Sequence, residues 1–148
     1  MKKNLIIVLI VLFTNNIFAK EKVIAKIPEA SGISYSYKSN TLFVVNDEGS
    51  IYEINLEGQI LREKKIGKLD LEGIAVDDDN DLLLLAVEGD DEILILSKKK
   101  LKKKHKISIK REYKGVKVLK KGDDGLEGIA LYKNKIYLSN QSKNKYPK

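Results

Sequence analysis

The chain has 148 residues, of which 43% are hydrophobic and 33% are charged, and its formal net charge is +7 at pH 7. This length accommodates one domain, and the composition is that of a globular rather than a disordered protein. Cysteine is absent, which excludes disulfides, thiolate metal sites and a cysteine nucleophile. His105 is the only histidine and lies within a run of lysines, so a serine triad would have to use it as the base. We therefore predict no catalytic residues.

The N-terminus has the pattern of a secretory signal peptide. Lys2-Lys3 forms a basic start, Leu5–Phe13 is an unbroken apolar stretch, and Ala19 is a small residue suited to cleavage. The apolar stretch is short for a membrane span, although an uncleaved anchor is the alternative. We therefore expect residues 1–19 to be a helical signal peptide. Residues 20–148 are then an exported domain, in the periplasm or associated with the cell envelope.

A short sequence repeat organises the rest of the chain. Leu-Glu-Gly-Ile-Ala occurs at 71–75 and again at 126–130, and a related Ser-Gly-Ile-Ser occurs at 31–34. Each copy precedes a turn and then an apolar strand that ends in an oxygen-bearing side chain. The strands expected after the three turns are 42–45, 82–87 and 136–138. In the first two units a further strand is expected, at 51–54 and 92–96.

The composition of these strands predicts their surroundings. Leu82–Val87 shows no polar alternation, so both of its faces are expected to be buried. Units of about 40 residues built from short antiparallel strands are typical of propeller blades. The glycines of the repeats, Gly32, Gly73 and Gly128, permit close approach of the innermost strands. We predict an all-β fold, a partial β-propeller of about two and a half to three blades.

The third strand of each blade is less regular. In the first blade, a hairpin turn at Asn55–Gly58 leads to a strand expected over 60–66. In the second blade, we expect a lysine-rich excursion in place of this hairpin.

Three segments of the sequence resemble a known family. They are "EASGISYSYKSNTLFVVNDEG", "DLEGIAVDDDN" and "GLEGIALYKNKIYLSNQ", and they resemble the SdiA-regulated family of exported bacterial proteins, relatives of NHL-type and esterase-like propellers. The resemblance extends from about Ile27 to Gln141. It implies a propeller of about six blades in the cell envelope, a calcium ion near the axis and no firmly assigned activity. Since a closed propeller has roughly four to eight blades, we expect a truncated product. Assembly from several copies is the alternative.

Strand geometry predicts one site. In an antiparallel hairpin, the start of the first strand lies beside the end of the second. The predicted neighbours are Glu72 with Glu88, Glu127 with Asn140, and Ser31 with Asp47. All of these would gather at one mouth of the central channel of the propeller. Such a group of oxygens suits calcium, which takes six to eight oxygen ligands. We predict Asp47, Glu72, Glu88, Glu127 and Asn140 as calcium ligands. The alternative is that the glutamates accept hydrogen bonds from backbone N–H groups and bind no metal.

Lys98–Lys106 contains much of the excess positive charge. The favoured interpretation is a solvated loop at the outer edge of a blade, whose lysines prevent pairing with other strands. An anionic membrane surface is the alternative partner. We expect no nucleic-acid binding, because no aromatic residue interrupts the run for base stacking.

The sequence thus predicts an exported cell-envelope module of the SdiA-regulated type. It would bind an unidentified small molecule or envelope component, or act as a scaffold, with calcium on its axis. The alternative is a calcium-dependent esterase or lactonase, in which the metal polarises a carbonyl and which truncation impairs.

Overall fold

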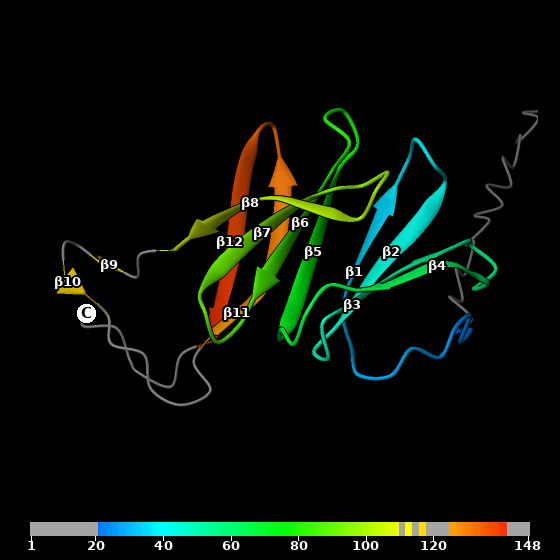
Figure 1. Ribbon diagram of the computed structural model, residues 1–148, viewed down its shortest axis with the longest axis horizontal. Helices are drawn as coiled ribbons and strands as arrows, with labels where there is room; N and C mark the ends of the chain where they lie inside the picture. The colour runs from blue at the N-terminus through cyan, green and yellow to red at the C-terminus, as the bar shows by residue number, and fades with distance from the viewer. Residues whose placement is uncertain (1–20, 110–111, 114–115, 118–124, 142–148) are drawn as a thin grey trace, which may run out of the picture.

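The computed structural model describes residues 21–109, 112–113, 116–117 and 125–141 (Figure 1). The expected signal helix over residues 1–19 lies outside this part of the chain. Every regular element of the described residues is a β-strand, which confirms the all-β prediction. The strands are β1 (Ala30–Ser36), β2 (Thr41–Asn46), β3 (Ser50–Ile54), β4 (Ile60–Lys65), β5 (Leu71–Asp77), β6 (Leu82–Val87), β7 (Glu92–Ser97), β8 (Lys102–Ser108), β9 (Glu112–Tyr113), β10 (Val116–Lys117), β11 (Gly125–Tyr132) and β12 (Lys135–Gln141).

The strands form successive antiparallel sheets. Strands β1 to β4 pair in sequence order to make the first four-stranded sheet, and β5 to β8 make the second in the same way. Strands β11 and β12 form a third, two-stranded sheet, and β9 pairs with β10 in a short separate ladder. The first three sheets follow one another along the molecule, as Figure 1 shows. Each corresponds to one of the three sequence units.

The hairpin turns explain where the strands end. The turns after β1, β5 and β7 each end in a residue with a left-handed backbone: Asn40 (φ 55°), Asp81 (φ 56°) and Leu101 (φ 47°). Asparagine and aspartate tolerate this region better than other non-glycine residues. Leu101 does not share that preference, but it is buried in the main core cluster, which holds it in place.

Burial confirms the prediction for Leu82–Val87. This segment is β6, the second strand of the middle sheet, and residues 83–87 are buried. Its odd-numbered side chains pack with Phe43, Val45 and Ile51 of the first sheet in the largest apolar cluster. Leu84, on the opposite face, packs with residues of the third sheet. A middle strand covered on both sides therefore has no polar face.

The glycines of the three repeats lie where the sheets approach most closely. A Cβ on Gly32 would lie 2.9 Å from the Cα of Gly73, and a Cβ on Gly73 would lie 2.9 Å from the Cα of Gly128. Such distances are shorter than real Cβ contacts, so glycine is required for this packing. The three inner strands β1, β5 and β11 therefore lie side by side, backbone against backbone.

The lysine run differs from the prediction. Residues 102–108 are not a loop or an excursion but the fourth strand of the second sheet, β8, which pairs with β7. All seven residues of β8 are exposed, as expected for an edge strand protected by lysines. The hydrophobic pattern failed here because an edge strand with two solvated faces needs no alternation of apolar and polar residues, and Ile107 is the one aliphatic residue of β8. In the part of the chain that the structure describes, no helix is long and apolar enough to span a membrane.

Candidate functional site

Three equivalent β-bulges build one end of the inner strands. In β1, β5 and β11 the pairing register shifts immediately before the glycine of the repeat. The extra residue at each bulge is Ser31, Glu72 or Glu127. A bulge re-aims the side chain of the extra residue and bends the strand. Since the three strands lie side by side, these side chains come to the same end of the stack.

Around the middle bulge, three carboxylates converge. Asp70, Glu72 and Glu88 each offer an oxygen that lies within 4.8 Å of the others, and we call this group the acidic mouth. Asp70 and Glu88 are joined by a backbone hydrogen bond, in which the N–H of Glu88 donates to the carbonyl of Asp70 at 2.9 Å. This bond brings the end of β6 beside the start of β5. The predicted proximity of Glu72 and Glu88 is therefore found.

The acidic mouth is electrostatically unfavourable when fully ionised. The pKa of Glu72 is raised to about 7. Burial is the largest cause, followed by a hydrogen bond with the Asp70 carboxyl and by the charges of Asp70, Glu127 and Glu88. In addition, the Oδ1 atom of Asp70 is buried and accepts no hydrogen bond from the described residues. A buried acceptor without a donor costs stability unless another group satisfies it.

The oxygen set fits a calcium ion. Calcium–oxygen distances are about 2.3–2.6 Å, so oxygens on opposite sides of one ion are roughly 5 Å apart. The oxygens of the acidic mouth lie within 4.8 Å of one another and so are close enough to share one ion. A cation would supply the missing partner of Asp70 Oδ1 and neutralise the repulsion at Glu72. Asp70, Glu72 and Glu88 are the residues that would hold it.

The remaining predicted ligands lie around this group in different settings. Glu127 is close enough to raise the pKa of Glu72 through its charge. Asn140 lies beside the third bulge, where it pairs with Leu126, but its side-chain amide donates to the carbonyl of Gln141. Asp47 is exposed and lies outside the acidic mouth. It borders a neighbouring hollow of about 370 Å³ that Asp70 also lines.

Ser31 occupies the bulge position of the first sheet without joining the carboxylates. Its hydroxyl donates to the carbonyls of Leu71 and, at 3.3 Å, of Val45. It therefore links the first sheet to the second.

Sequence reasoning missed Asp70. It lies immediately before β5, and Glu29 occupies the corresponding place before β1. In both units the backbone carbonyl of this acidic residue accepts a hydrogen bond from the residue that follows the second strand, Asp47 or Glu88. The recurrence of an acid three residues before the repeat glycine was the signal that could have identified it.

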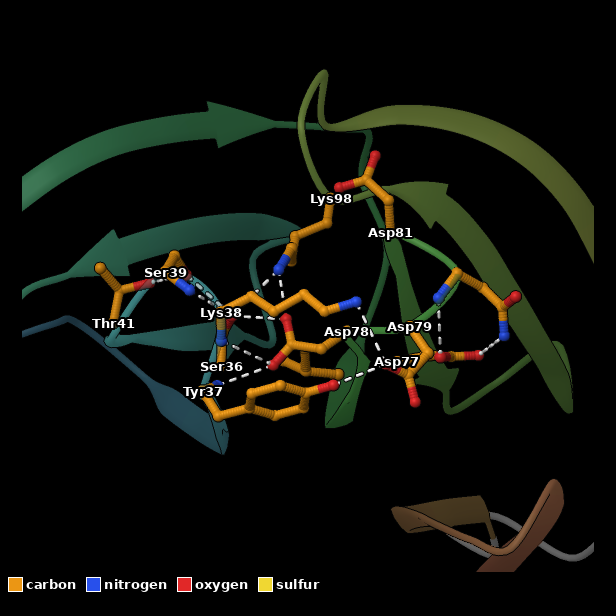
Figure 2. Close-up of polar contacts among 12 residues, drawn as sticks. Ser36, Tyr37, Lys38, Ser39, Thr41, Asp77, Asp78, Asp79, Asp81 and Lys98 are labelled. Carbon is orange, nitrogen blue, oxygen red and sulfur yellow. Dashed lines mark hydrogen bonds and ion pairs between the residues drawn. The ribbon is translucent and has the colours of Figure 1, made fainter.

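A second polar cluster lies at the other end of the inner strands (Figure 2). Ser36 ends β1, while Asp78 and Lys98 begin the turns after β5 and β7; we call these three residues the interblade clasp. The Ser36 hydroxyl donates to Asp78 Oδ1 at 2.6 Å, and the Lys98 ammonium donates to Ser36 Oγ at 3.0 Å and pairs with Asp78. The clasp therefore ties the first sheet to the second.

The clasp carboxylate is fully satisfied. Its other oxygen, Asp78 Oδ2, accepts hydrogen bonds from the backbone N–H groups of Tyr37 at 2.7 Å and Lys38 at 3.3 Å. Burial by itself raises the pKa of Asp78, but the hydrogen bonds from Lys98, Ser36 and Lys38 outweigh it, so the pKa is lowered. Asp78 therefore stays ionised inside the molecule.

Lys98 departs from the prediction for the lysine run. Its side chain is 10% exposed and is committed to Asp78, whereas Lys99 and Lys100 in the same turn are exposed. The carbonyls of Lys98 and Lys99 accept hydrogen bonds from Arg62 of β4, at 3.2 and 2.8 Å. The first residue of the run is thus part of the contact between the sheets, and only the later lysines form a solvated surface.

Solved structures with the same architecture are propellers. The chain is similar to Kuenenia stuttgartiensis hydrazine synthase, with 18% identity and a TM-score of 0.58 over 82% of this chain and 32% of that chain. For the β-propeller domain of Cps50 (Swd1) from Myceliophteria thermophila, the identity is 11% and the TM-score 0.52, over 72% and 30%. For the WD40 repeats of RRP9 the values are 14% and 0.57, over 79% and 34%.

These similarities establish the fold. This chain spans about a third of the length of each of the three solved chains. At these identities the likeness shows the architecture alone, a β-propeller made of successive antiparallel sheets. It confirms the predicted partial propeller. No curated protein matches the sequence.

A family model matches almost the whole sequence. The model is that of the SdiA-regulated proteins, and it matches residues 11–147. This range contains all three repeat units together with the acidic mouth and the interblade clasp. The chain therefore belongs to the SdiA-regulated family.

Proposed function

We propose that this chain is an exported module of the cell envelope that binds calcium at the acidic mouth. In this role it offers a ligand-binding or scaffolding surface to a small molecule or to a component of the envelope. The observation that carries the calcium site is the convergence of Asp70, Glu72 and Glu88, whose oxygens lie within 4.8 Å of one another. The proposal of export depends on the basic start, apolar stretch and small residue of the first 19 residues.

Two properties of the acidic mouth support a cation over a purely structural role. Carboxylates that only support the fold find donors, as Asp78 does at the clasp. At the mouth, by contrast, Asp70 Oδ1 is buried without a donor among the described residues, and the pKa of Glu72 is raised to about 7. A bound calcium ion supplies positive charge to all three carboxylates and lowers the pKa of Glu72. Calcium and protons therefore compete for the mouth.

The test is calorimetric titration of the purified protein with calcium chloride at pH 6 and pH 8. We expect binding at both values, weaker at pH 6, because Glu72 must lose its proton. Glu72→Gln should weaken binding at pH 8 at least tenfold and remove most of the pH dependence. Glu57→Gln, an exposed substitution in the turn between β3 and β4, is the matched control and should bind like the wild type. Absence of calcium binding to the folded wild-type protein at pH 8 would refute the proposal.

The same samples test the hydrolase alternative. Ester and lactone substrates are added with and without calcium. Hydrolysis that needs calcium and is lost in Glu72→Gln and Glu127→Gln would favour the enzyme. Calcium binding without turnover favours the module.

A further inference from the structure

We propose that Gly125, the first residue of β11, positions the Glu88 carboxylate in the acidic mouth. Glycine at this place leaves a space on the third sheet, and the side chain of Glu88 from the second sheet occupies it. Gly125 offers no side-chain ligand of its own and acts through Glu88. Its effect on calcium rests on the function proposed above, whereas its contact with Glu88 can be tested without calcium.

The contact between the two residues is close. A Cβ added to Gly125 would overlap Cγ and Oε1 of Glu88 and would lie 2.6 Å from its Cδ. Apart from the chain neighbours of Gly125, these three atoms are the nearest to the added Cβ, and all of them belong to one side chain. Real Cβ atoms essentially never come within 3.0 Å of such atoms. Any residue other than glycine at this position must therefore displace the Glu88 side chain.

The requirement for glycine at Gly125 differs from that at the repeat glycines. At Gly32 and Gly73 the nearest atom to an added Cβ is a backbone atom of the next sheet, so glycine there serves the packing of the inner strands. At Gly125 the nearest atoms are those of a side chain. The backbone of Gly125 is not left-handed, so its conformation is open to other residues. The space beside Gly125 thus serves a carboxylate rather than the approach of two strands.

The same place carries an acid in the other two units. The bulges of β5 and β11 align the two strands and give Asp70 and Gly125 equivalent positions, each three residues before the repeat glycine. In the first unit the residue at this place is Glu29. The third sheet therefore lacks the acid that its counterparts carry, and a carboxylate from the second sheet lies there instead.

The backbone of Glu88 is held by the second sheet. Its N–H donates to the carbonyl of Asp70 at 2.9 Å, which fixes the end of β6 to the start of β5. Strand β11 lies against both β5 and β6. With its backbone fixed on the second sheet and its side chain received by the third, Glu88 brings an oxygen within 4.8 Å of those of Asp70 and Glu72. The acidic mouth is thus built at the boundary between the second and third sheets.

Gly125→Ala should therefore weaken calcium binding without unfolding the protein. Because the added methyl group would overlap Cγ, the Glu88 side chain has to turn about its Cα–Cβ bond into another rotamer. The hydrogen bond to Asp70 uses the backbone of Glu88 and is left in place. A cation at the mouth would lose one of three carboxylates, and calcium affinity depends on the number of charged ligands.

The contact itself is tested by NMR on the calcium-free wild-type protein. One Hα proton of a glycine points in the direction that a Cβ would take, so at Gly125 this proton points at Cγ of Glu88. We expect a strong nuclear Overhauser effect between the Hα protons of Gly125 and the Hγ protons of Glu88. Its absence from the folded protein overturns the proposal, whether or not calcium binds.

The consequence for calcium is tested by calorimetric titration of the wild type, Gly125→Ala, Glu88→Ala and the double variant at pH 8. We expect Gly125→Ala to weaken binding about tenfold, as substitutions that misplace a metal ligand do. The double variant should bind like Glu88→Ala, because the methyl group then has no carboxylate to displace. Gly67→Ala is the matched control. Its added Cβ would meet only the side chain of Leu69, at 3.4 Å, and it should bind like the wild type.

The outcomes separate this proposal from that of the calcium site. Calcium binding that is equal in the wild type and Gly125→Ala overturns the positioning role and leaves the site intact. A further loss of affinity when Gly125→Ala is added to Glu88→Ala also overturns it, because the glycine then acts other than through Glu88. A wild type that binds no calcium refutes the proposed function. In that case, or if Gly125→Ala does not fold, the nuclear Overhauser effect in the wild type decides whether Gly125 makes the space for Glu88.

Discussion

The two ends of the inner strands place carboxylates in opposite electrostatic settings. At the interblade clasp, Asp78 is matched by Lys98, Ser36 and two backbone N–H groups, and its pKa is lowered. At the acidic mouth, Glu72 is partly buried and faces other carboxylates, and its pKa is raised to about 7. The same strands run between the two ends, so the difference comes from the residues at those ends: Glu72 at a bulge of β5 on one side, and Ser36 with the turn residues Asp78 and Lys98 on the other. One end holds the sheets together with its own charges, and the other retains an anionic charge that a cation can neutralise.

The largest expected effect is at the clasp. Lys98→Met removes the cation and leaves the Asp78 carboxylate buried without its charged partner. Breaking one side of a buried ion pair costs several kcal/mol, and since three hydrogen-bond donors to Asp78 remain, we expect a loss of about 3 kcal/mol in the free energy of unfolding. Urea denaturation followed by circular dichroism measures it.

The control for this variant lies in the same turn. Lys99 is exposed and uses its backbone carbonyl rather than its side chain in the contact with Arg62. Lys99→Met should therefore change the free energy of unfolding by less than about 0.5 kcal/mol. Equal losses of unfolding free energy in the two variants would show that the ion pair between Lys98 and Asp78 does not stabilise the fold.

The next effect concerns the close backbone contact between the inner strands, which lies between the acidic mouth and the interblade clasp. A Cβ on Gly73 would lie 2.9 Å from the Cα of Gly128 and 3.0 Å from the backbone nitrogen of Ile129. These atoms belong to another sheet and cannot rotate away, so Gly73→Ala must separate the sheets, at a cost of about 2 kcal/mol. A lower thermal midpoint measures the loss.

Gly67→Ala provides the matched comparison. Its added Cβ would meet only the flexible side chain of Leu69, at 3.4 Å, and its backbone is not left-handed. We expect a clearly smaller change in the thermal midpoint. A Gly73→Ala protein as stable as the Gly67→Ala protein would contradict the close packing of the inner strands.

A smaller effect distinguishes the acidic mouth from the clasp by its pH dependence. The pKa of Glu72 rises from 4.5 to about 7 on folding, so the folded state holds this proton more tightly than the unfolded state. The stability that it contributes is present below pH 4.5 and is lost as the pH rises to 7. Because Glu72 is partly exposed and solvent screens its neighbours, we expect a loss of about 1 kcal/mol.

Glu72→Gln tests this directly. The variant cannot ionise at this position, so its free energy of unfolding should exceed that of the wild type above pH 7 and approach it near pH 4.5. Urea denaturation at intervals of pH gives both curves, with Glu57→Gln as a control that should follow the wild type. Parallel curves for the wild type and Glu72→Gln would show that neither burial nor the neighbouring carboxylates raise the pKa of Glu72 in the folded state.

The sequence predicted the parts of the molecule in which the order of apolar and polar residues directly reflects burial or strand pairing. Leu82–Val87 was recognisable because a strand buried on both faces has no polar residue. Glu72 and Glu88 were recognisable because antiparallel pairing fixes which residues meet. The strand β8 was not, because an exposed edge strand can consist mostly of lysine and other polar residues. Lys98 was missed for a related reason, since nothing in a run of similar residues marks the one whose partner lies on another sheet.

The smallest expected effect separates two adjacent aspartates at the clasp end. Asp79 is exposed. It accepts a hydrogen bond from the Tyr37 hydroxyl at 2.6 Å and pairs with Lys38 at 3.1 Å, so it has both a polar and a charged partner. Exposed pairs of this kind contribute little because water and salt screen them. Asp79→Asn should therefore leave the urea midpoint unchanged, whereas Asp78→Asn should lower it markedly, because Lys98 then stays buried without a counter-charge. Equal effects would show that burial is not what distinguishes the clasp, and the contrast between the two ends would then have to be explained by the number of partners alone.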